Sequence, residues 1–124
     1  MRELALVATG GAIGATARYV VGGLVSSRTG AGFPWGTLIV NVLGAFLLGL
    51  LMALSTERAV VSTAWRTFLG IGVLGGFTTF STLSFETVRL LEQGALLVAS
   101  ANMLGSAVVG IAAAIAGLAV GRAL

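Results

Sequence analysis

The polar residues of this chain concentrate in one short stretch, Gly75–Glu86, which reads GGFTTFSTLSFE. Two glycines lead into five hydroxyl residues, at positions 78, 79, 81, 82 and 84. Glycine weakens a helix, and Ser and Thr side chains compete for its backbone groups. The stretch therefore predicts a broken helix, whose freed carbonyl oxygens could coordinate a small cation. Phe80 lies within the stretch, and the positive edge of its ring could face an anion or simply pack.

Two asparagines lie in otherwise apolar segments, each with a hydroxyl residue four positions away. Thr37 and Asn41 form one pair, and Asn102 and Ser106 form the other. Residues at this spacing share a helix face, and a row of uncharged N–H and O–H donors could replace the water around an anion. The alternative is hydrogen bonding between helices, which contributes about 1 kcal/mol or less per contact. We favour the functional interpretation for Asn41 and the interhelical hydrogen bond for Ser106.

Two charged residues also belong to the candidate site. Arg18 interrupts an apolar segment, where it could draw anions into a vestibule or extend to the lipid headgroups. Glu86 closes the hydroxyl stretch and could pair with an arginine.

The composition is that of an integral membrane protein. Hydrophobic residues make up 57% of the 124 positions and charged residues only 9%, with a mean hydropathy of +1.08. The runs 29–56, 67–85 and 93–121 carry no charge, and each is near or above the roughly 20 residues that cross a bilayer as a helix. A fourth segment, 4–25, is apolar except for Arg18. We therefore expect an all-α fold with four transmembrane helices in one membrane domain, residues 1–124. Their expected bounds are 4–26, 35–56, 65–91 with a break near 75–80, and 95–121.

Several function classes are excluded or disfavoured. The chain has no Cys, His or Asp, which removes thiolate chemistry and most catalytic arrangements, so we expect no enzyme. The net charge of +3 comes from scattered arginines, which do not form a nucleic-acid patch. The first residues resemble a signal peptide with an Ala-x-Ala site at 15–17, but Glu3 and the glycines in the apolar region favour a retained helix.

Four spans place both termini and the middle loop on one side of the membrane, with four arginines against three on the other. This is almost no bias under the positive-inside rule. Either the short loops carry no orientation signal, or copies insert both ways and pair as an antiparallel dimer.

Small-xxx-small glycine pairs allow close helix approach, within one subunit or between two. They are Gly10/Gly14, Gly72/Gly76 and Gly117/Gly121.

Three segments together resemble the Fluc/CrcB fluoride channel family: GGAIGATARY (10–19), PWGTLIVNVLGAFLLG (34–49) and GIGVLGGFTTFSTLSFE (70–86). The resemblance implies an antiparallel, dual-topology homodimer with two ion pathways in the cell membrane. It also implies a structural Na⁺ at the dimer centre, held by the main-chain oxygens of Gly75 and Thr78.

The resemblance assigns roles to further residues by their place in the motifs. The pathway asparagine corresponds to Asn41 and the first pathway phenylalanine to Phe80. The hydroxyl track, a row of hydroxyl residues along the pathway, corresponds to Thr37, Ser81, Thr82 and Ser106. The vestibule residues correspond to Arg18 and Glu86. Two positions depart from the family pattern, because Leu83 replaces a second phenylalanine and Asn102 a tyrosine.

The function that this resemblance implies is passive, fluoride-selective export from the cytoplasm. A subunit that conducts only with a homologous second chain, or not at all, is the alternative, since Leu83 lacks a ring edge. A proton-coupled exporter resembling the small multidrug resistance transporters is disfavoured, because it needs a titratable carboxylate at membrane depth. The first helix has no acidic residue beyond Glu3, and Glu86 lies near a helix end.

Overall fold

The computed structural model describes all residues from 1 to 124, and all of its regular structure is helical. The first span is α1 (Arg2–Thr29), and the second is α2 (Trp35–Met52) with its π-helical continuation η1 (Ala53–Glu57). The fourth is α6 (Leu96–Ala123). The third span consists of α3 (Thr63–Arg66), π-helical η2 (Thr67–Leu74), α4 (Gly75–Phe77) and α5 (Phe80–Glu92). All four spans are long and apolar enough to cross a membrane, which confirms the prediction of an all-α, four-span fold.

The observed helices are slightly longer than expected. The first span begins two residues before and ends three residues after the expected 4–26, and the other bounds differ by two residues or fewer. The third span is interrupted at Thr78 and Thr79, whose extended backbones have ψ angles of 156° and 115°.

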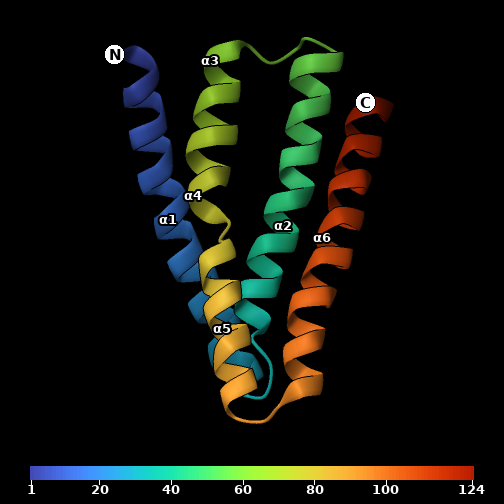
Figure 1. Ribbon diagram of the computed structural model, residues 1–124. Coiled ribbons are helices and arrows are strands. Elements are labelled where there is room, and N and C mark those ends of the chain that lie inside the picture. Colours follow the sequence, from blue (N-terminus) through green and yellow to red (C-terminus); the bar gives the residue numbers. More distant parts are fainter.

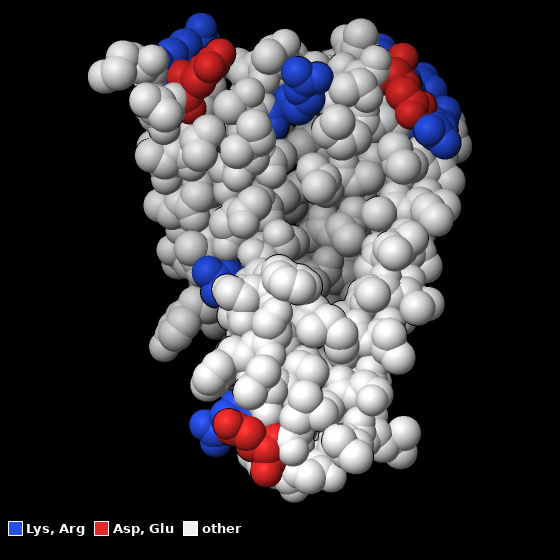
Figure 2. All heavy atoms as spheres, viewed as in Figure 1, with Lys and Arg blue, Asp and Glu red and all other residues white.

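Both termini and the loop between the second and third spans lie at one end of the bundle, and the other two connections lie at the opposite end (Figure 1). Charged groups gather toward these two ends (Figure 2). The middle of the visible face is almost uncharged, with one basic group partway along it (Figure 2). This distribution suits a bilayer, whose hydrocarbon core penalises charge.

The spans pack mainly as two pairs, α1 against η2 and α4, and α2 against α6. Glycines make both contacts close. A Cβ at Gly14 would collide with the carbonyl of Val73 and the backbone nitrogen of Phe77, and one at Gly117 with the carbonyl of Phe46. The glycine pairs of the first, third and fourth spans are therefore used for packing within one subunit.

The two pairs diverge toward the end that holds the termini (Figure 1). The visible face is hollowed between them (Figure 2). Only 17 of the 124 residues are buried, and many large apolar side chains on all four spans are exposed. The hollow reaches down to the break in the third span, where the candidate site lies.

Candidate ion pathway at the helix break

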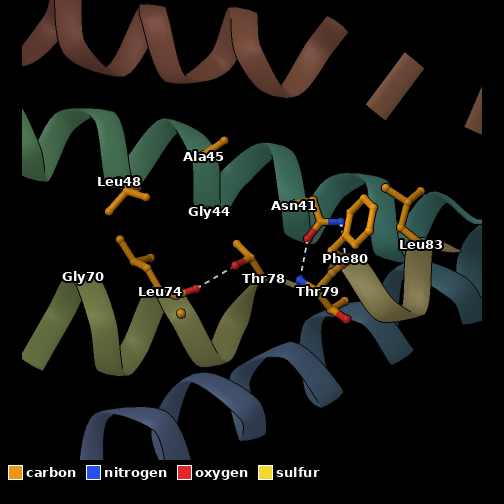
Figure 3. A pocket seen from close by; sticks show the side chains of 11 residues that line it. Asn41, Gly44, Ala45, Leu48, Gly70, Leu74, Thr78, Thr79, Phe80 and Leu83 are labelled. Carbon is orange, nitrogen blue, oxygen red and sulfur yellow. Dashed lines mark hydrogen bonds between the residues drawn. The ribbon is translucent and has the colours of Figure 1, made fainter. Parts of the chain in front are cut away.

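Asn41 holds the broken segment through two hydrogen bonds to Thr79 (Figure 3). Its Nδ2 donates to the Thr79 carbonyl at 3.0 Å, and the Thr79 backbone N–H donates to its Oδ1 at 2.8 Å. Because Nδ2 carries two hydrogens, one N–H remains free of any hydrogen bond within the chain. Asn41 thus supports the break and keeps one donor for a ligand.

Two carbonyl oxygens lose their helical partners at this point. In a continuous helix, the N–H of Thr79 would donate to the Gly75 carbonyl and the N–H of Thr82 to the Thr78 carbonyl. Instead the first donates to Asn41, and the second donates to Thr79 Oγ1 at 3.2 Å. Unwound carbonyls of this kind are the groups with which discontinuous membrane helices hold Na⁺. The chemistry of Gly75 and Thr78 therefore fits the expected cation site.

The side chain of Thr78 is engaged elsewhere. Its Oγ1 donates to the Leu74 carbonyl at 3.0 Å, and its backbone N–H donates to the same oxygen at 3.0 Å. Its methyl group fills the space beside Gly44, where a Cβ would collide with it. Thr78 can therefore offer its main-chain oxygen, while its side chain fixes the position of that oxygen.

These groups border a hollow of about 340 Å³ between α2 and the third span. Phe80 lines the hollow with 74% of its surface exposed, whereas Leu83 is buried with 6% exposed. The lining residues are Asn41, Gly44, Ala45, Leu48, Gly70, Leu74, Gly75, Thr78, Thr79, Phe80 and Leu83. The structure thus brings together Asn41, Phe80 and the two carbonyls, with Leu83 at the margin (Figure 3).

Two cavities with several polar residues in their lining lie on the other side of Thr79. One, of about 190 Å³, is lined by Arg18, Ser26, Thr37, Thr79 and Thr82, together with Tyr19, Gly22, Gly36 and Val40. A larger one, of about 610 Å³, has Glu86, Arg89 and Gln93 in its lining. Ser26, Gly36 and Thr37 border both cavities. We call this pair of adjoining cavities the polar route, because it runs from the end of the third span to the break.

Arg18 and Glu86 both face this route. Arg18 Nε donates to the Gly76 carbonyl at 3.1 Å, so its side chain turns into the bundle and does not extend to the headgroups. Glu86 Oε1 accepts a hydrogen bond of 2.5 Å from Thr37 Oγ1, and Oε2 is buried without a partner. The sequence left the partner of Glu86 open, with an arginine as one possibility; within this chain the partner is the hydroxyl of Thr37.

The Thr79 hydroxyl caps the helix that follows the break, and the hydroxyls of Ser81 and Thr82 lie beside it. Thr79 Oγ1 lies 3.0 Å from Thr82 Oγ1 and 3.3 Å from Ser81 Oγ. Ser81 is exposed, whereas Thr82 is half-buried. Thr82 thus belongs to the polar route, and Ser81 lies beside it on the outer face of α5.

Asn102 and Ser106 lie apart from this group. Both are buried on α6, where Asn102 Nδ2 donates to Thr87 Oγ1 at 3.2 Å. Asn102 Oδ1 and Ser106 Oγ have no hydrogen-bond partner. The interhelical hydrogen bond favoured for Ser106 is therefore absent from this chain. Asn102 makes such a bond instead, because its longer side chain reaches α5.

Comparisons with known proteins extend these observations. The model of the family described as "CrcB-like protein, Camphor Resistance (CrcB)" matches residues 5–118. A protein of Agrobacterium fabrum named "Fluoride-specific ion channel FluC" is 54% identical over this whole chain and 99% of its own length. Proteins of the same name from Magnetococcus marinus and Thermus thermophilus are 50% and 51% identical. These two alignments cover 97% and 100% of this chain, and 98% of each relative. The chain belongs to the CrcB-like family.

The three segments that carry the family resemblance enclose the site. Segment 10–19 supplies the α1 face that packs on the third span, 34–49 forms most of α2, and 70–86 contains the break. Three polar residues of this CrcB-like chain were missed by the motif interpretation, namely Ser26, Thr79 and Thr87. Thr79 carried a detectable signal, because a threonine that follows a predicted break and precedes a helix is a typical N-cap. No pattern in the sequence indicates a role for Ser26 or Thr87.

Proposed function

We propose that this chain is the subunit of a passive, fluoride-selective channel that exports fluoride from the cytoplasm across the cell membrane. The observations that carry the proposal are the polar route, which ends at Thr79, and Asn41, which binds the backbone of Thr79 and keeps one N–H free. The choice of ion is supported by relatives that are named fluoride-specific ion channels. Their sequences are 50–54% identical to this chain over 98–99% of their own length.

The chemistry of the route suits a small, strongly hydrated anion. Its available donors are the hydroxyls of Ser26 and Thr82 and the guanidinium of Arg18, whereas the hydroxyl of Thr37 already donates to Glu86. Uncharged donors in a narrow path can replace hydration without holding the ion too tightly to leave. Fluoride that enters as neutral HF ionises inside the cell, and a passive pore lets the anion leave down its gradient.

We further propose that two copies assemble in opposite orientations around a structural Na⁺. Phe80, which is 74% exposed, then gains contacts from the partner. One chain offers two freed carbonyls, from Gly75 and Thr78, whereas hard cations bind about six oxygens. A second copy doubles the number of carbonyls, and the near-even arginine count allows both orientations.

The remaining alternative is a subunit that requires a homologous second chain or does not conduct. The two departures from the family pattern support this alternative, because Leu83 and Asn102 are buried and stand where the family pattern has larger aromatic side chains. Under this alternative, the partner chain supplies the aromatic ring that Leu83 lacks.

The deciding experiment uses liposomes that contain only this chain, loaded with potassium fluoride and made permeable to K⁺ with valinomycin. A fluoride electrode should record release, while liposomes loaded with chloride should release almost none. Failure to release fluoride, from protein that elutes as a folded dimer, would favour the heteromeric or silent subunit. Equal release of chloride would overturn the proposed selectivity.

A further inference from the structure

Helix α2 holds both residues of the break from one face. Asn41 binds the backbone of Thr79, and the methyl group of Thr78 fills the space above Gly44. Positions 41 and 44 are one helical turn apart, so they present one surface to the third span. The extended segment is therefore positioned by contacts to α2 as well as by its own glycines.

The bond from Thr79 N–H to Asn41 Oδ1 determines what happens to the Gly75 carbonyl. This N–H has two alternative acceptors, namely Asn41 Oδ1 in the structure and Gly75 O in a continuous helix. While Asn41 holds it, the Gly75 oxygen lacks its helical donor and can bind another ligand. Without Asn41, the N–H would be free to return to Gly75 and occupy that oxygen.

We infer that Asn41 is a positioning residue for the cation site, which it keeps open by holding Thr79 away from the Gly75 carbonyl. This inference rests on the cation site of the proposed function. It gives Asn41 a second role besides the anion pathway, because one N–H binds Thr79 while the other remains free. The two ion sites are then coupled through one side chain, and a change at Asn41 alters Na⁺ affinity as well as fluoride flux.

The first test measures Na⁺-dependent thermal stabilisation of the purified full-length chain in detergent, with choline chloride as the reference salt. For Asn41→Ala, the Na⁺ concentration at half-maximal stabilisation should rise at least about tenfold, the equivalent of one lost hydrogen bond. Thr56→Val is the matched control, because the Thr56 hydroxyl bonds only to Met52 of its own span. Its Na⁺ dependence should equal that of the unmodified protein.

The second test needs no substitution and applies even if Asn41→Ala fails to fold. The chain has only two asparagines, Asn41 and Asn102, so ¹⁵N-asparagine labelling gives two side-chain amide groups in an NMR spectrum. Addition of NaCl should shift the Asn41 amide signals, with choline chloride having no such effect. Asn102 bonds to Thr87 at a distance from the break and should not respond.

The outcomes separate this inference from the channel itself. Unchanged Na⁺ affinity in Asn41→Ala with lost fluoride flux would overturn the inference and leave Asn41 as a pathway donor alone. Stabilisation by Na⁺ without any shift of the Asn41 signals would also overturn it. An unmodified protein that conducts fluoride but does not respond to Na⁺ would refute the cation site and this inference together, while the channel function would stand.

Discussion

The hydroxyl of Thr37 on α2 donates to one carboxylate oxygen of Glu86 on α5, and the other oxygen of Glu86 is buried without a partner. This pair links the two helices at the point where the two cavities of the polar route meet. A half-satisfied carboxylate at partial burial costs free energy. The single hydroxyl of Thr37 is its only hydrogen-bond donor from the chain.

Thr37→Val should destabilise the protein by about 1–3 kcal/mol, because it leaves the Glu86 carboxylate without that donor. Glu86→Gln in the same chain should restore part of the loss, since an amide carries no charge to desolvate. Unfolding in mixed micelles of the two single variants and the double variant measures the interaction energy. Thr16→Val is the control, because the Thr16 hydroxyl bonds within its own helix. Strict additivity of the two substitutions would contradict the coupling.

Phe80→Ala should lower fluoride flux about fivefold, corresponding to roughly 1 kcal/mol for one aromatic edge contact. The stability of the isolated subunit should change little, because the ring is largely exposed. Flux from liposomes and thermal unfolding are measured on the same preparations. Leu97→Ala removes an 85% exposed side chain on α6 that lines none of the cavities described above, and its flux should be unchanged. Equal effects of both substitutions would argue against a pathway role for Phe80.

Asn102→Leu should leave the free energy of unfolding within about 1 kcal/mol of its starting value. The substitution loses one hydrogen bond to Thr87 but also removes a buried oxygen that has no partner. Asn102→Asp has nearly the same shape and should cost several kcal/mol, because it places a charge where no surface is exposed. Denaturation curves compare the two variants, and fluoride flux from Asn102→Leu tests the pathway role separately. A large loss of stability in Asn102→Leu would show that its bond to Thr87 outweighs the unpaired oxygen.

Gly14→Ala should strongly reduce stability, by about 2 kcal/mol or more, since its Cβ would collide with backbone atoms of Val73 and Phe77. Gly11 on the same helix is the matched control, because a Cβ there meets nothing within 4 Å. Gly11→Ala should be neutral or stabilising by about 0.5–1 kcal/mol, from the higher helix propensity of alanine. Thermal unfolding distinguishes the two. If Gly14→Ala and Gly11→Ala had similar stabilities, α1 and the third span could separate without a cost in free energy.

The spans and the break could be predicted from sequence because their causes are local. Charge-free runs set the four helices, and the glycines followed by Thr78 and Thr79 locate the interruption. The glycine pairs predicted close packing but left open whether it joined spans of one subunit or of two. That choice depends on which helices become neighbours, which no single segment specifies.

The partners of the polar side chains could not be predicted in this way. Asn41 and Thr79 are 38 positions apart in sequence, and their meeting depends on how far α2 is displaced along the third span. The same displacement gives Glu86 a threonine partner, while the position of α6 leaves Ser106 with none. A shift of α2 by one helical turn would change the partners of Asn41 and Glu86 without altering any motif. The sequence therefore predicted which residues are polar at membrane depth, but not how they pair.

The two main helix pairs also constrain how the chain can be made. Neither joins neighbours in sequence, because α1 packs on the third span and α2 on α6. During synthesis, the glycine face of α1 stays uncovered until η2 and α4 enter the bilayer, and Arg18 has no Gly76 carbonyl to bind. The partner of α2 is the fourth span, which is made after the other three. A chain stopped before α6 would leave the face of α2 unpaired and open to membrane proteases and insertases, so the second helix pair forms only after the fourth span has been made.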